Sequence, residues 1–179
     1  MSTDRPALSG QDADQSPTGN AGNNSAQRGH RNSFVLSPTP WAGGASDVGS
    51  HRTPNQDALA VAAGLDVDGR PLAVAAVSDG VSTSIGSEHA SVIAVQTACR
   101  NLIDILEALP EPEPAALASA MVDAFALANE HIVAQADTDI PGAWSCTLTV
   151  TLVHKGTILV GNVGDSAATG SPMRGNRCC

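Results

Sequence analysis

The sequence contains few basic residues. Nine Lys and Arg side chains stand against 18 Asp and Glu side chains, and the formal net charge is -9. A surface that binds nucleic acid needs a stripe of Lys and Arg to displace counterions from phosphates, and binding to anionic lipid needs a similar positive patch. The scarcity of positive charge therefore predicts that neither nucleic acid nor a membrane surface is a partner.

Long hydrophobic runs are lacking as well. No stretch approaches the roughly 18 consecutive apolar residues that a membrane-spanning helix needs. The first residues, Met1 to Asp4, are polar and lack the apolar centre of a secretory signal. These two absences predict a cytoplasmic protein.

Cysteine is also scarce, at four residues with irregular spacing: Cys99, Cys146, Cys178 and Cys179. This number and spacing fit neither a disulfide framework nor a set of zinc ligands. We expect the first two thiols to be buried structural residues.

The 179 residues are enough for one domain, and the composition divides them into three parts. Residues 1–40 are rich in Ser, Gly, Asn, Gln, Asp and Pro, with no run of large apolar residues before Phe34, so we predict a disordered tail. Residues 41–166 carry regular hydrophobic patterns and form the predicted domain. Residues 167–179 show neither strand nor helix periodicity.

Two hairpins and two helices are predicted within the domain. Apolar runs at Ala58–Ala63 and Leu72–Val77 flank a turn-forming stretch, and Cys146–His154 alternates before a Lys-Gly turn and a returning strand at Thr157–Val163. One helix is predicted from Ser87 to before Pro110. A second begins near Pro114, with the buried face Leu117, Met121, Val122, Phe125, Ala128 and Ile132. This order predicts an α+β fold in which helices cover sheets.

Polar residues that suit metal and phosphate chemistry lie beside the ends of predicted strands. They lie in three segments, residues 47–58, 76–82 and 161–166. Aspartates at the ends of neighbouring strands can converge on one point, and hard cations such as Mg²⁺ and Mn²⁺ select such oxygen ligands. Gly80 would let its carbonyl approach a cation closely, and Arg52 offers a planar fork for two phosphate oxygens.

These segments, in this order, resemble the type 2C, metal-dependent protein serine/threonine phosphatases (the PPM family). The resemblance extends over roughly residues 46–166. The matching residues are Gly49, Arg52, Asn55-Gln56-Asp57-Ala58, Val77-Ser78-Asp79-Gly80-Val81, Glu88-His89-Ala90-Ser91, Ser145-Cys146-Thr147 and Asn162-Val163-Gly164-Asp165-Ser166.

The resemblance implies a fold, an activity and a metal centre. The implied fold is a four-layer αββα sandwich, in which two antiparallel sheets are flanked by helix pairs. The implied activity is hydrolysis of phosphoserine and phosphothreonine in phosphorylated proteins by a water that two Mn²⁺ or Mg²⁺ ions activate at each complete site. No oligomeric state is implied.

The resemblance also implies roles for five residues. Asp79 would bridge the two metals, and the carbonyl of Gly80 would complete one of them. Asp57 would bind metal or orient its water, Arg52 would hold the substrate phosphate, and Asp165 matches an additional, weaker metal site.

Three positions depart from the family pattern. Gln56 stands where Glu is common, Val81 stands where some members carry His, and Ser82-Thr83 replaces Gly-Gly. Two histidines lie nearby in the sequence, His51 and His89, and we interpret both as solvent-facing or structural.

The residues after Ser166 do not resemble the family, whose members carry further metal-binding aspartates there. If residues 167–173 were encoded by GCG GCT ACT GGC TCC CCG ATG, one restored C before this run would give Arg-Gly-Tyr-Trp-Leu-Pro, a typical continuation, so a frameshift is one hypothesis for residues 167–179. We therefore expect an incomplete sandwich with little or no phosphatase activity. The alternatives are a non-catalytic phosphoprotein-binding or regulatory remnant and a misfolded fragment.

Overall fold

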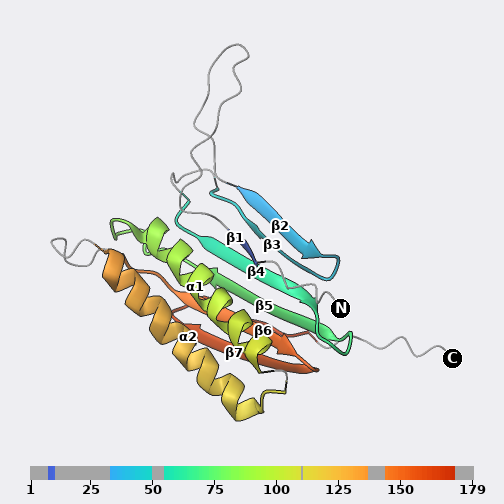
Figure 1. The fold of residues 1–179 in the computed structure, drawn as a ribbon. Helices are drawn as coiled ribbons and strands as arrows, with labels where there is room; N and C mark the ends of the chain where they lie inside the picture. Colours follow the sequence, from blue (N-terminus) through green and yellow to red (C-terminus); the bar gives the residue numbers. More distant parts are fainter. Residues whose placement is uncertain (1–7, 11–32, 50–54, 110, 137–143, 172–179) are drawn as a thin grey trace, which may run out of the picture.

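A five-stranded antiparallel sheet forms the centre of the computed structural model, which describes residues 8–10, 33–49, 55–109, 111–136 and 144–171 (Figure 1). The strand order is β1-β4-β5-β6-β7. The strands are β1 (Leu8–Gly10), β4 (Ala58–Leu65), β5 (Pro71–Ser78), β6 (Leu148–His154) and β7 (Thr157–Val163). Both predicted hairpins are confirmed, β4 with β5 and β6 with β7.

Positive backbone angles explain why the two hairpins turn where they do. Gly69 has φ +75° in the turn between β4 and β5, and the N–H of Asp66 donates to the carbonyl of Arg70 at 2.8 Å. Lys155 and Gly156 have φ +48° and +79° between β6 and β7. Two consecutive positive φ values match the twist of the flanking strands, so a two-residue turn closes this hairpin.

Two helices cover one face of the sheet, α1 (Ser87–Ala108) and α2 (Pro114–Gln135), as Figure 1 shows. Residues from both helices and from β4, β5 and β6 form the main hydrophobic core. The predicted buried face of α2 is wrong at Val122, whose side chain is 68% exposed, whereas its neighbour Met121 is buried. Adjacent helical residues point about 100° apart, and this rotation carries Val122 away from the core that Met121 enters.

A two-stranded sheet covers part of the opposite face. It pairs β2 (Phe34–Thr39) with β3 (Ala42–Ser46) and packs on β4, where Phe34 and Leu36 lie against a second core cluster that includes Leu59 and Val61. The predicted disordered tail is therefore wrong for β2, and wrong for the backbone of β1, which pairs with β4. Alternate apolar residues in β2 find a partner sheet that composition alone does not reveal. The other tail residues, 1–7 and 11–32, lie outside the described residues.

The described residues are α+β, as predicted, with a helix layer, a five-stranded sheet and a two-stranded sheet. They account for three of the four predicted layers. The two-stranded sheet contacts β4. On the same face of the five-stranded sheet, β7 is not covered by any described residue, and its side chains Ile158 and Val160 are 67% and 47% exposed. No helix in the described ranges has the length and apolar character needed to cross a membrane.

The two described cysteines differ in burial. Cys99 lies within the core, with its thiol 3.6 Å from the carbonyl oxygen of Ala60, and burial raises its pKa to about 12. Cys146 is half-buried, and partial burial likewise raises its pKa. Since the thiolate is the reactive form, the prediction of a structural thiol is confirmed for Cys99. Cys178 and Cys179 lie outside the described residues.

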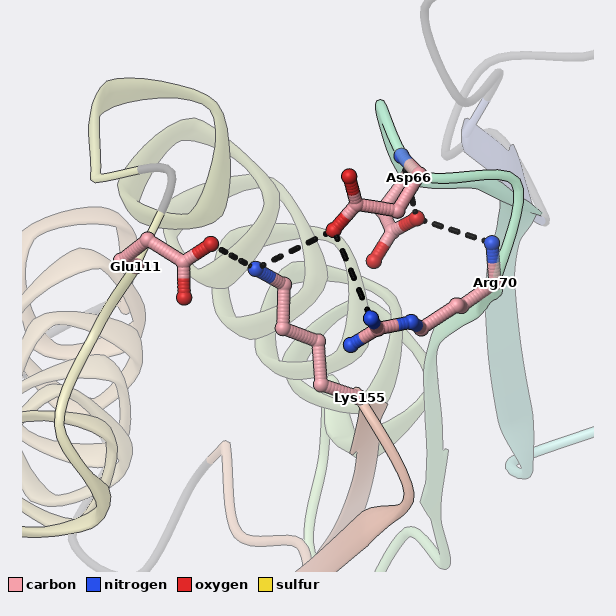
Figure 2. A network of polar contacts seen from close by, with 5 residues as sticks. Asp66, Arg70, Glu111 and Lys155 are labelled. Carbon is pink, nitrogen blue, oxygen red and sulfur yellow. Dashed lines mark hydrogen bonds and ion pairs between the residues drawn. The ribbon is translucent and has the colours of Figure 1, made fainter.

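A network of charged residues joins three turns at the end of the sheet where β4 ends and β5 begins (Figure 2). Lys155 pairs with Glu111 of the α1–α2 connection, and its Nζ lies 3.7 Å from a carboxylate oxygen of Asp68. The backbone N–H of Arg70 donates to Asp66 Oδ1 at 2.8 Å. The Lys155 contact lowers the pKa of Glu111. These contacts fix the helix pair to both hairpin turns.

Buried His154 is expected to make the protein less stable at acidic pH. It is 6% exposed beside Lys155, and burial, followed by the charge of Lys155, lowers its pKa. The unfolded chain, with a His pKa of about 6.5, binds the proton first as the pH falls, so stability decreases below about pH 6.5. Urea midpoints at about pH 7.5 and about pH 5.5 measure this decrease.

The matched variants for this experiment are His154→Gln and His131→Gln. His154→Gln should reduce the difference between the two urea midpoints, because glutamine does not titrate. His131 lies on the exposed surface of α2, so His131→Gln should leave the difference in place. An unchanged difference in His154→Gln would contradict the assignment.

Candidate functional site

A pocket of about 270 Å³ lies at the opposite end of the sheet from the charged network. It forms where β4 begins, where β5 ends and where the chain leaves β3 and β7. Its polar lining residues are Ser46, Asp47, Asp57, Ser78, Asp79 and Ser166. Three aspartates from three different chain segments therefore face one pocket.

The structure brings together two of the predicted site residues. Asp57, directly before β4, and Asp79, directly after β5, both line the pocket and both are exposed. Asp165 does not line it, although the neighbouring Ser166 does. Arg52 lies outside the described residues. The predicted convergence of strand-end carboxylates is thus observed for the Asp57 and Asp79 pair.

Gly80 is confined by backbone atoms on two sides. Its N–H donates to the carbonyl of Gln56 at 3.1 Å. A Cβ at this position would lie 2.6 Å from that carbonyl oxygen and 3.0 Å from the carbonyl oxygen of Ser87. Any other residue would push the loop after β5 away from β4, so glycine is needed here for close packing. The predicted role of its own carbonyl as a metal ligand stays a prediction.

The family departure at Gln56 has a structural explanation. The side-chain amide of Gln56 donates to the hydroxyl of Ser87 at 2.8 Å, and Ser87 is fully buried at the start of α1. Gln56 is also absent from the pocket lining. Its neutral side chain therefore links β4 to α1 instead of facing the pocket.

His89 does not reach the pocket lining. Its ring is exposed and stacks on Trp144 with ring centroids 5.4 Å apart, and its Nδ1 lies 3.4 Å from a carboxylate oxygen of Glu88. These contacts agree with the solvent-facing interpretation. His51 lies outside the described residues.

Asp47 lines the pocket as well, although its sequence context predicted no role for it. Its Oδ1 accepts a hydrogen bond from the N–H of Gly49 at 2.6 Å, and its Oδ2 accepts one from the hydroxyl of Ser33 at 3.1 Å. Aspartate commonly binds the backbone two residues on and so forms a turn. The Asp-x-Gly spacing was the available signal for this turn.

The donor chemistry of the pocket fits a hard divalent cation. Carboxylates of Asp47, Asp57 and Asp79 and the hydroxyl of Ser166 supply only oxygen, which Mg²⁺ and Mn²⁺ prefer. However, no three Asp, Glu, His or Cys side chains within the described ranges are grouped as ligands of one ion. The three aspartates therefore line one pocket, but within the described residues they do not form a set of ligands for one ion.

The match of the chain to a known protein family identifies its class. Residues 47–175 match the family described as protein phosphatase 2C. Because this match spans most of the chain, the protein belongs to the protein phosphatase 2C family. No curated protein and no solved structure matches the chain.

Proposed function

We propose that this protein hydrolyses phosphoserine and phosphothreonine in proteins with the help of two divalent cations, Mn²⁺ or Mg²⁺. One observation carries the proposal: within a protein phosphatase 2C domain, Asp57 and Asp79 reach a common pocket from separate strand ends. Phosphorylated proteins are the proposed partners. The cytoplasmic location stays a prediction.

Each of the five site residues predicted from the sequence has a proposed task. Asp79 and Asp57 would hold the cations, with the carbonyl of Gly80 beside them, and Arg52 would hold the substrate phosphate through its guanidinium fork. Asp165 would serve a weaker metal site. When bound, the cations would lower the pKa of water and neutralise charge on the phosphoryl oxygens.

We expect this activity to be weak. Two carboxylates, Asp57 and Asp79, are proposed for the cation pair, and both line the pocket. Two anionic ligands leave much of the positive charge of two divalent cations uncompensated, which lowers the affinity of the site.

Removal of metal tests the proposal. We expect slow release of inorganic phosphate from a phosphoserine or phosphothreonine peptide in Mn²⁺, complete loss with EDTA, and recovery when Mn²⁺ is added in excess of the chelator. A phosphotyrosine peptide serves as the specificity control and should be hydrolysed more slowly. Turnover that is insensitive to EDTA would contradict the proposal.

Non-catalytic binding of phosphoproteins is the second candidate function. The small number of carboxylates proposed for the cation pair, Asp57 and Asp79 alone, favours it, because such a pocket can contact a phosphate group without activating water for its hydrolysis. Fluorescence anisotropy with labelled phosphopeptides distinguishes the two functions. Saturable binding that needs the phosphate, without any release of phosphate in Mn²⁺, would support the binding function.

A further inference from the structure

Two loops line the pocket: the loop after β5 carries Asp79, and the loop after β7 carries Ser166. The side chain of Thr147 lies between them. Thr147 directly precedes β6 and is 9% exposed. Its Oγ1 accepts a hydrogen bond from the backbone N–H of Asp79 at 3.0 Å and lies 2.8 Å from the hydroxyl oxygen of Ser166. A single hydroxyl thus contacts both loops, since it has one donor and two acceptor positions.

The backbone of Thr147 reinforces the hold on Asp79. The N–H of Thr147 donates to the carbonyl of Asp79 at 2.8 Å, and the buried hydroxyl of Ser78 donates to the carbonyl of Thr147 at 2.5 Å. Asp79 is therefore bonded to the same residue through both its N–H and its carbonyl. This pairing fixes the point from which the Asp79 carboxylate enters the pocket.

The methyl group of Thr147 contacts the loop after β7. Gly164 has φ +106°, and a Cβ on it would lie 2.6 Å from Thr147 Cγ2. The chain leaving β7 therefore packs directly on Thr147 before it reaches Ser166. The hydroxyl and the methyl group have separate contacts, and separate substitutions can remove them.

We propose that Thr147 is a positioning residue that sets the distance between the Asp79 loop and the Ser166 loop, and thereby the cation affinity of the pocket. This inference rests on the proposed function, because it assumes that the pocket binds a divalent cation. Residues that orient metal ligands affect metal affinity without touching the metal. Thr147 has the contacts for this task and is not itself a lining residue of the pocket.

The test compares Mn²⁺ affinity among variants of the full chain by isothermal titration calorimetry. Thr147→Val keeps the shape and removes the hydroxyl, and we expect about tenfold weaker binding. Thr147→Ser restores the hydroxyl and should bind within about threefold of the wild type. The matched control is Thr151→Val, the same exchange four residues further along the chain and within β6, which should bind within about twofold of the wild type.

A second measurement needs no metal. Hydrogen exchange of the Asp79 amide in the metal-free chain should accelerate by up to about tenfold in Thr147→Val, because one hydrogen bond is lost, and should not change in Thr151→Val. If Thr147→Val fails to fold, Thr147→Ala removes the same hydroxyl from a residue that does not line the pocket and should weaken Mn²⁺ binding about tenfold.

The outcomes separate the two ideas. Equal Mn²⁺ affinity and equal exchange in wild type and Thr147→Val would overturn the positioning role. Equal losses of affinity in Thr147→Ser and Thr147→Val would also overturn it, because the hydroxyl would then not be the determinant. A wild-type chain that binds no Mn²⁺ would overturn the proposed function, while the exchange rate of the Asp79 amide would still decide whether Thr147 holds the loop.

Discussion

Asp79→Asn is expected to weaken Mn²⁺ binding at the pocket by at least about 100-fold and to abolish Mn²⁺-dependent phosphate release. Removal of a residue that only supports a metal ligand costs up to about 100-fold in affinity, and loss of a ligand should cost at least as much. The substitution replaces an anionic ligand with a neutral amide of similar size. The backbone bonds between Asp79 and Thr147 do not involve the carboxylate, so the loop should keep its position.

Calorimetric titration with Mn²⁺ measures this effect, and two further aspartates provide the controls. Asp123→Asn changes the net charge equally on the exposed surface of α2 and should leave the affinity unchanged. Asp165→Asn should have a small effect, because Asp165 does not line the pocket. Wild-type affinity in Asp79→Asn would refute the assignment of Asp79 as a metal ligand.

Leu102→Ala is expected to lower the free energy of unfolding by about 3 kcal/mol or more, the usual cost of a buried leucine. Leu102 is fully buried in α1, within the cluster that joins both helices to the sheet. Truncation leaves a cavity that tightly packed neighbours fill only in part. This loss is a large fraction of the stability of an ordinary domain, which is about 5 to 15 kcal/mol.

Urea unfolding followed by far-ultraviolet circular dichroism measures the loss in Leu102→Ala. Val122→Ala is the control, because the Val122 side chain is 68% exposed on the neighbouring helix. It should change the free energy of unfolding by less than about 0.5 kcal/mol. Similar losses in the two variants would mean that α2 presents a different face to the sheet.

Local patterns in the sequence were enough to predict most of the elements. The alternation along β6 and the apolar run of β4 are properties of consecutive residues, and the hairpin turns have a clear glycine signal at Gly69 and Gly156. The end of α1 before Pro110 and the start of α2 at Pro114 agree with the prediction, because proline interrupts or begins a helix through its own ring.

Features that depend on distant partners were harder to predict. Strand β2 was assigned to a disordered tail, because the cluster against which Phe34 packs belongs to β4 and β5. The face of α2 was misjudged at Val122 for a similar reason, since hydrophobicity alone does not show which side meets the sheet. Both errors concern packing between elements and not the propensity of a segment.

For the candidate site, too, residues with a local signal were predicted and residues that depend on distant partners were not. Asp57 and Asp79 could be found because each lies beside a recognisable strand end, and the pocket contains both. Asp47 and Thr147 received no role, because their importance comes from hydrogen bonds to Gly49, Asp79 and Ser166 that only the folded chain forms.

The hydrogen bond between Asp79 and Thr147 also bears on how the site forms. The two residues are 68 positions apart in the sequence, with both helices between them. Each hairpin can form from neighbouring residues, but β5 meets β6 only after this long loop closes, which is the slower and entropically costlier step. A ligand held between the two loops therefore binds only chains that have completed the loop closure. By mass action it would stabilise the whole sheet, not one hairpin.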